Sequence, residues 1–139
     1  MSPRIERPSP AEFAELAGAA RQVRRRARVP YSKYKVGAAL RALDGTIIVG
    51  CNVENASYPL TMCAERVAAG KAVSEGLKRF DAIAVIGDSQ KPTPPCGACR
   101  QVLWEIAGNI WVYLVGPRGG SELFRLEELL PLPFDRRSF

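Results

Sequence analysis

The feature that most restricts the fold of this chain is the alternation of short apolar runs with amphipathic stretches of helical length. The run "FDAIAVIGD" at 80–88 is apolar at most positions, which is typical of a buried strand. It lies between two helical patterns, at 61–76 and 96–108. Strands that alternate with helices of this length are joined by right-handed crossovers. The pattern therefore predicts a sheet with helices on both faces.

The first helix is predicted at 9–27 by the residues at its start. Ser9 stands at the N-cap position, Pro10 follows at the first helical position, and Glu12 completes a capping box. Apolar residues then recur at helical spacing as far as Val23, so one stripe of this helix is expected to be buried.

Four more strands and a last helical turn complete the predicted fold. Two strand patterns within 34–55 flank Asp44-Gly45, a strong hairpin signal that predicts antiparallel pairing. Two further strands, at 110–116 and 122–126, precede a short helical turn at 127–131. We therefore expect one α/β domain over residues 1–139, a three-layer α/β/α sandwich around a mixed five-stranded sheet.

Composition and charge restrict the environment and the partners. The 139 residues contain no apolar run near the roughly 18 residues that a membrane span needs, and the first ten residues contain no hydrophobic signal segment. We expect a cytoplasmic protein without a membrane partner. The net charge is +6, and five arginines fall within 21–28. A solvated helix end, favoured by the helix dipole, explains them better than a nucleic-acid patch does.

The chain contains no histidine. Serine triads with histidine, cysteine–histidine nucleophile pairs and histidine-ligated metals are thereby excluded. Any metal or acid–base chemistry must use cysteine, carboxylates, lysine or tyrosine.

Three residues whose side chains could take part in catalysis or metal binding stand at the start of the predicted helix 61–76, namely Cys63, Glu65 and Arg66. An ordinary helix start would also explain them, with a small core cysteine, a glutamate that suits the helix dipole and a solvated arginine. In a regular helix, residues two apart point to nearly opposite sides. Cys63 and Glu65 can therefore face one site only if Cys63 lies at the cap.

Two more cysteines, Cys96 and Cys99, begin the second crossover helix. Both crossover helices should open at the same sheet edge, so three thiols are predicted to converge on one ion. A thioredoxin-like redox pair would use Cys96 and Cys99 but leave Cys63 without a role. A structural four-cysteine zinc site would need Cys51, which strand alternation places on the face opposite Asn52, among apolar side chains. Three ligands and an open fourth position indicate a catalytic zinc.

The motifs "PYSKYKVGAAL", "GCNVENASY", "CAERVA", "PCGACRQVL" and "EELLP" resemble those of the short, homotetrameric cytidine deaminases, over most of residues 30–134. The resemblance implies one Zn²⁺ per chain, held by Cys63, Cys96 and Cys99. It implies that Glu65 carries protons between the attacking water, N3 of the ring and the leaving amine. It also implies a homotetramer with shared active sites.

Further roles follow from the same resemblance. Asn52 and Glu54 correspond to the pair that hydrogen-bonds a ribose hydroxyl. Backbone groups of Ala64 and of Pro94, the residue before Pro95, correspond to those that hold the pyrimidine. Substrate contacts from neighbouring subunits are implied for two aromatic residues, Tyr58 and Phe134.

Two positions depart from the family's usual residues. The resemblance also implies a substrate-binding role for Tyr34, which stands where phenylalanine is usual, so its hydroxyl needs a partner. Pro94 stands where serine or threonine is common, although its carbonyl remains available.

One site residue is predicted from charge. Three thiolates and Zn²⁺ sum to one negative charge, so a nearby cation is needed to keep the metal acidic. Arg66, three residues after Cys63, is placed to donate hydrogen bonds to its sulfur. The implied function is hydrolytic deamination of cytidine and 2'-deoxycytidine in pyrimidine salvage. The alternatives are a blasticidin-type nucleoside aminohydrolase and a zinc-stabilised module that binds RNA through the basic helix.

Overall fold

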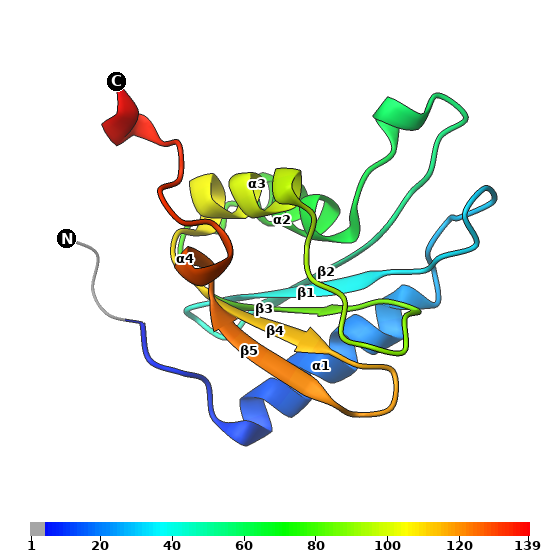
Figure 1. The fold of residues 1–139 in the computed structure, drawn as a ribbon. Helices are drawn as coiled ribbons and strands as arrows, with labels where there is room; N and C mark the ends of the chain where they lie inside the picture. The colour runs from blue at the N-terminus through cyan, green and yellow to red at the C-terminus, as the bar shows by residue number, and fades with distance from the viewer. Residues whose placement is uncertain (1–4) are drawn as a thin grey trace.

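The computed structural model describes residues 5–139 of the chain (Figure 1). The first four residues, part of the segment for which no signal peptide is expected, lie outside the described residues. The elements, in chain order, are α1 (Pro10–Arg24), β1 (Gly37–Ala42), β2 (Ile47–Cys51), the 3-10 turn η1 (Tyr58–Leu60), α2 (Ala64–Ser74), β3 (Phe80–Ile86), α3 (Gly97–Ala107), β4 (Trp111–Val115), β5 (Ser121–Arg125), α4 (Leu126–Leu129) and the 3-10 turn η2 (Arg136–Ser138).

The five strands form one mixed sheet in the order β2-β1-β3-β4-β5. The hairpin at Asp44-Gly45 is confirmed, because β1 and β2 pair antiparallel around it. Among the strands described for residues 5–139, β3 and β4 form the one parallel pair, whereas β1 with β3 and β4 with β5 are antiparallel. The predicted mixed five-stranded sheet is therefore confirmed, and β3 is buried along its whole length at its centre.

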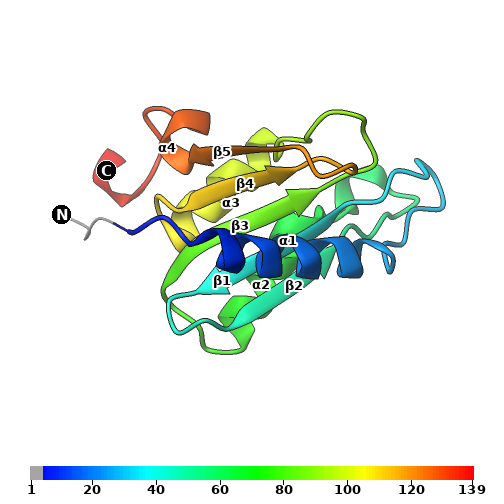
Figure 2. The same ribbon diagram turned by 90° about the horizontal axis from the view of Figure 1, so that it is seen from below.

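Helices cover both faces of the sheet, as Figures 1 and 2 show. On one face α1 packs Leu16 and Ala20 against Ala39 and Ile86. On the other face α2 and α3 lie side by side over a larger core that includes Leu40 and Leu103. The three-layer arrangement is confirmed. The predicted cap of α1 is also present, since the Ser9 hydroxyl accepts from the Glu12 amide and Glu12 returns a bond to the Ser9 amide.

The N-terminal turn of α2 lies very close to β2. A Cβ atom on Gly50 would come within 2.6 Å of both the Ala64 carbonyl oxygen and the Ala68 amide nitrogen. Only a glycine leaves room for this approach, and the buried alanines of α2 allow the same closeness along the helix. The contact fixes the position of the residue that precedes α2, Cys63.

One expectation about burial is wrong. Cys51 is half-buried rather than enclosed among apolar side chains. The reason is that β2 is an edge strand, so the end of the strand is covered from fewer directions. Within residues 5–139, none of the helices combines the length and the hydropathy that a membrane crossing requires.

Candidate active site with a three-cysteine cluster

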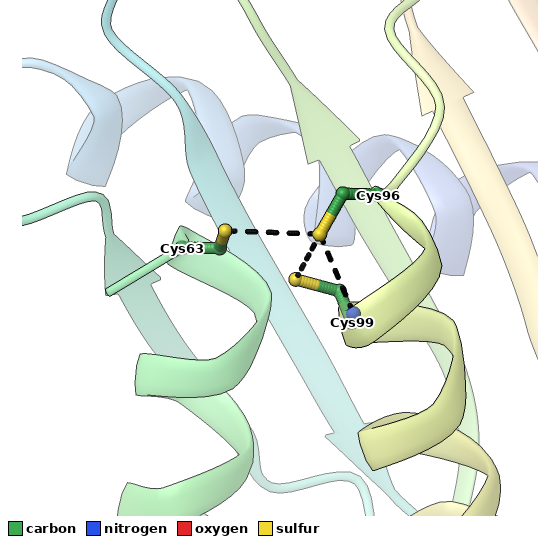
Figure 3. Close-up of side chains that lie close together, drawn as sticks. All are labelled: Cys63, Cys96 and Cys99. Carbon is green, nitrogen blue, oxygen red and sulfur yellow. Dashed lines mark hydrogen bonds between the residues drawn. The ribbon is translucent and has the colours of Figure 1, made fainter. Parts of the chain in front are cut away.

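Three cysteine sulfurs converge between the starts of α2 and α3 (Figure 3). The Sγ atoms of Cys63, Cys96 and Cys99 all lie within 4.8 Å of one another. Cys63 to Cys96 is 3.9 Å, and Cys96 to Cys99 is 3.3 Å. Cys63 and Cys96 are the N-cap residues of the two helices, and both have extended backbone. The expected placement of Cys63 at a cap, before the helix becomes regular, is confirmed.

The surroundings of the cluster favour a thiolate at Cys63. A hydrogen bond from Cys99 and one from Arg66 lower the pKa of the Cys63 thiol to about 5, against the opposing effect of burial. The Nη2 atom of Arg66 lies 3.5 Å from the Cys63 sulfur and 3.3 Å from the Thr61 carbonyl oxygen. The hydrogen bond with Cys63, together with burial, raises the pKa of Cys99.

Glu65 is buried beside the cluster, with 4% of its surface exposed. Burial raises the pKa of its carboxyl group to about 7. A carboxyl group with such a pKa can take up and release a proton near neutral pH. Since Cys63 lies at the cap and Glu65 in the first helical turn, both side chains reach the same region.

The donor set fits a zinc ion. Three cysteine sulfurs at two helix N-termini form a site that a soft divalent metal favours. Cys51 follows Ile47 and Val49 in strand alternation, and those two residues pack on the α1 face of the sheet, away from the cluster. The cluster thus offers three protein ligands, so that a tetrahedral metal would keep one position open for water or substrate.

The structure brings Asn52 and Glu54 to the segment that leads into β1. The Asn52 amide oxygen accepts from the Val36 amide at 2.9 Å, and its nitrogen donates to the Tyr34 carbonyl at 2.8 Å, which leaves one N–H free. The carboxylate of Glu54 accepts from the amides of Tyr31 and Ser32 and from the Ser32 hydroxyl. These bonds lower the pKa of Glu54, that from the Ser32 side chain most.

The other predicted substrate-binding residues differ in burial: Ala64 is buried, Tyr34 is half-buried and Pro94 is exposed. Ala64 is fully buried at the start of α2, where the first backbone N–H groups lack helical acceptors. Pro94 is exposed in the loop before Cys96. The hydroxyl of Tyr34 has the partners it was predicted to need, namely the side chains of Ser89 and Thr93.

Two aromatic residues, Tyr58 and Phe134, lie apart from one another in the single chain. Tyr58 is 70% exposed on η1, and Phe134 is 64% exposed in the C-terminal segment. Figure 1 shows η1 and the C-terminal segment at opposite ends of the α2–α3 layer. The Phe134 backbone is fixed by Gln101, which donates to its carbonyl oxygen at 2.7 Å.

Arg100 supports the site and was missed by the sequence analysis. Its Nε donates to the Pro95 carbonyl at 2.8 Å, directly before Cys96, and its Nη1 donates to the Leu129 carbonyl at 2.9 Å. The available signal was an arginine one turn into a largely apolar helix, four residues after Cys96. Among the arginines of 21–28, Arg24 and Arg28 donate to backbone carbonyls within the chain, and Arg24 also lies 3.5 Å from the Asp88 carboxylate, so part of this basic segment has partners inside the protein.

Comparison with known proteins identifies the family. The family described as "Cytidine and deoxycytidylate deaminase zinc-binding region" matches residues 12–115. The chain belongs to this family. A cytidine deaminase of Sporosarcina psychrophila is 49% identical over 126 residues, 90% of this chain and 93% of the relative.

The chain is also similar to a solved cytidine deaminase structure and to a deaminase with a different substrate. The crystal structure of cytidine deaminase from Burkholderia pseudomallei has a TM-score of 0.85 and 45% identity, covering 87% of this chain and 98% of that one. A blasticidin-S deaminase of Bacillus cereus is 35% identical over 113 residues, 76% of this chain and 80% of the relative. The family binds zinc, and the three-cysteine cluster is the group of residues in this chain that fits the ion.

Proposed function

We propose that this protein is a zinc-dependent hydrolase that converts cytidine and 2'-deoxycytidine to the uridine products and ammonia. The observation that carries the proposal is the juxtaposition of three cysteine sulfurs within 4.8 Å of one another with the buried carboxyl group of Glu65. Metal ligands and a proton carrier are the two components that hydrolytic deamination of a pyrimidine requires. The 49% identity to a cytidine deaminase supports the nucleoside as substrate.

In this proposal each residue has a definite task. Cys63, Cys96 and Cys99 hold zinc, which when bound makes water more acidic and so supplies a nucleophile at neutral pH. Glu65 takes a proton from the attacking water and delivers protons to N3 of the ring and to the departing ammonia. Burial supports this task, because it raises the pKa of Glu65 to about 7, so that the carboxyl group can both take up and release a proton at neutral pH.

The ribose is assigned to Asn52 and Glu54. The Asn52 side chain has a second N–H that its bonds to the 34–36 segment do not use. Oε1 of Glu54 already accepts from two backbone amides, whereas Oε2 accepts only from the Ser32 hydroxyl and keeps one lone pair. Ala64 and Pro94 are assigned to the base through their backbone groups. The bonds that hold both side chains in place support a preorganised ribose site.

We assign Tyr58 and Phe134 to neighbouring subunits of a homotetramer. Their exposure in the single chain supports this, since apolar aromatic rings that are 70% and 64% exposed are candidates for burial in an interface. Light scattering and activity measured on the same fractions test the assignment. A fully active monomer would contradict it.

A panel of substrates tests the proposed function. The zinc-loaded protein is incubated with cytidine, 2'-deoxycytidine, cytosine and blasticidin S, and ammonia release is measured. We expect turnover of both nucleosides and very poor turnover of cytosine, which lacks the ribose that Asn52 and Glu54 hold. Preferential turnover of blasticidin S would support the related aminohydrolase, and an unchanged ultraviolet spectrum of cytidine would support a binding module.

A further inference from the structure

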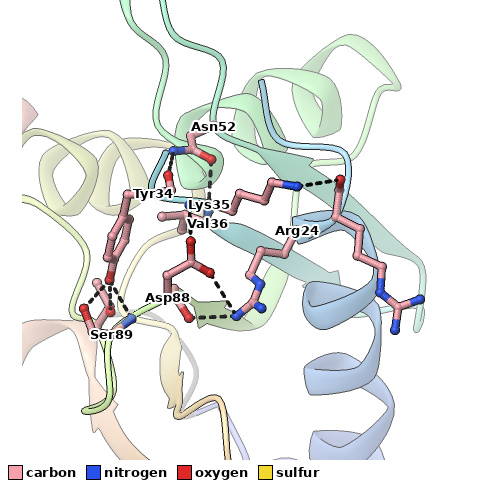
Figure 4. Close-up of polar contacts among 10 residues, drawn as sticks. Arg24, Tyr34, Lys35, Val36, Asn52, Asp88 and Ser89 are labelled. Carbon is pink, nitrogen blue, oxygen red and sulfur yellow. Dashed lines mark hydrogen bonds and ion pairs between the residues drawn. The ribbon is translucent and has the colours of Figure 1, made fainter. Parts of the chain in front are cut away.

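The loop from β3 to α3, residues 87–95, contains Pro94 and leads directly to Cys96, so it positions two residues of the candidate site. Hydrogen bonds hold this loop to the segment 34–36, which is distant in the sequence. The segment 34–36 leads into β1. Gly37 at the start of β1 pairs with Ile86 at the end of β3, so the two segments meet at one sheet edge. Figure 4 shows the contacts between them.

The phenol of Tyr34 is the centre of these contacts. Its hydroxyl forms hydrogen bonds with the side-chain hydroxyls of Ser89 and Thr93, the latter at 2.8 Å, and accepts from the Ser89 amide at 3.2 Å. Tyr34, Ser89 and Thr93 are all half-buried. The beginning and the end of the loop are therefore held by one oxygen atom from a residue more than fifty positions away in the sequence.

A second set of bonds fixes the same two segments. The carboxylate of Asp88 accepts from the Lys35 amide at 2.7 Å, and Arg24 donates to the Gly87 carbonyl at 2.9 Å. Arg24 also lies 3.5 Å from the carboxylate of Asp88. The loop start is thus held to α1 and to the residue after Tyr34 (Figure 4).

Position 87 needs a glycine because neighbouring side chains leave no room for a Cβ atom, whereas its φ angle is one that any residue can adopt. A Cβ atom at Gly87 would lie 2.6 Å from the Tyr34 hydroxyl oxygen and 2.7 Å from Thr93 Oγ1. The two hydroxyls occupy the space in which a side chain would stand. The close approach therefore depends on three positions together, Tyr34, Gly87 and Thr93.

The contacts continue from Tyr34 to the proposed ribose site. Gly37 pairs with Cys51 across the hairpin, which brings the following residue, Asn52, beside the 34–36 segment. The Asn52 amide holds that segment at both ends, through the Tyr34 carbonyl and the Val36 amide. One continuous set of hydrogen bonds therefore joins Asn52 to the loop that ends at Cys96.

We propose that the hydroxyl of Tyr34 is a positioning group, which holds the 87–95 loop so that the Pro94 carbonyl faces the base while Asn52 faces the ribose. The inference rests on the proposed function. It predicts that phenylalanine is worse than tyrosine at position 34 of this chain. Phenylalanine would leave the half-buried hydroxyls of Ser89 and Thr93 without their shared partner.

The test compares Tyr34→Phe, Thr93→Val and the double variant with the wild type, all in the zinc-loaded form. Tyr113→Phe is the matched control, because Tyr113 lies in β4 and packs against Phe13 on the α1 face of the sheet. Three quantities are measured: zinc per chain, KM and kcat for cytidine, and hydrogen exchange of the Ser89 amide.

Tyr34→Phe is expected to raise KM roughly three- to tenfold, the range for one lost hydrogen bond, with kcat within about twofold. Zinc content should not change, because Cys63 and Cys96 lie at the helix N-caps and Cys99 in the first turn of α3, all outside the 87–95 loop. Exchange of the Ser89 amide should become faster. Since both hydroxyls act through one bond, the double variant should be no worse than Tyr34→Phe alone.

An active wild type with an unchanged KM in Tyr34→Phe would overturn the inference, even if that variant unfolds at a lower temperature. Additive increases in KM for the two single variants would also overturn it. A wild type that turns over no cytidine would instead overturn the proposed function, so the two failures are distinguishable.

Discussion

Replacing Arg66 with glutamine removes the charged donor of the Cys63 sulfur. The guanidinium Nη2 lies 3.5 Å from that sulfur, and the arginine is half-buried. A hydrogen bond to a charged group contributes about 1.5–3 kcal/mol, whereas a neutral amide contributes about 0.5–1.5 kcal/mol. The substitution therefore weakens the hydrogen bond to the Cys63 sulfur by roughly 1 kcal/mol. This free energy corresponds to a pKa shift of about one unit.

The direction follows from the charge. A sulfur that has lost its cationic partner gives more electron density to zinc and makes the site less acidic. We expect Arg66→Gln to retain one zinc per chain, to lower kcat, and to move the acid limb of the pH–rate profile upward by about one unit. Arg26→Gln, at an exposed residue beyond α1, is the matched control and should leave the profile unchanged. An unchanged profile in Arg66→Gln at full zinc content would show that Arg66 does not affect the acidity of the site.

Three further predictions concern the carboxyl group, the metal ligands and the core. Glu65→Gln should keep zinc and fold but lose roughly 10²–10⁴-fold in turnover, because an amide cannot carry protons; near-normal rates would remove Glu65 from the mechanism. Cys51→Ser should retain zinc by elemental analysis whereas Cys96→Ser should lose it; zinc loss from Cys51→Ser would favour four cysteine ligands. Burial raises the pKa of Asp81, so its stabilising contribution is greatest below its unfolded pKa and is lost as pH rises through the folded pKa. The stability of Asp81→Asn relative to the wild type should therefore increase with pH across that interval in denaturant titrations, and a constant difference would contradict the prediction.

Local chemistry made much of the fold predictable. The capping box at Ser9 and the turn at Asp44-Gly45 depend on neighbouring residues, so the sequence alone predicts them. The convergence of the cysteines was predictable for a different reason. Consecutive crossover helices start at the same sheet edge, which brings Cys63 and Cys96 together although 33 positions separate them.

The features that could not be predicted depend on contacts between distant segments. The exposure of Cys51 follows from the place of β2 at the sheet edge, and local alternation does not contain the order of strands. The partners of Tyr34 are 55 and 59 positions away, in a loop without a regular pattern. A tyrosine at a packed position predicts that its hydroxyl has a partner, but the sequence does not show which residues supply it.

Cytidine turnover measured against zinc content is the decisive test of zinc-dependent deamination by this protein. The protein is stripped of metal with a chelator and reloaded in steps, and zinc per chain and ammonia release are measured on each sample. We expect turnover to rise in proportion to zinc and to stop rising at one ion per chain. Full turnover without zinc, or no turnover at one zinc per chain, would contradict it.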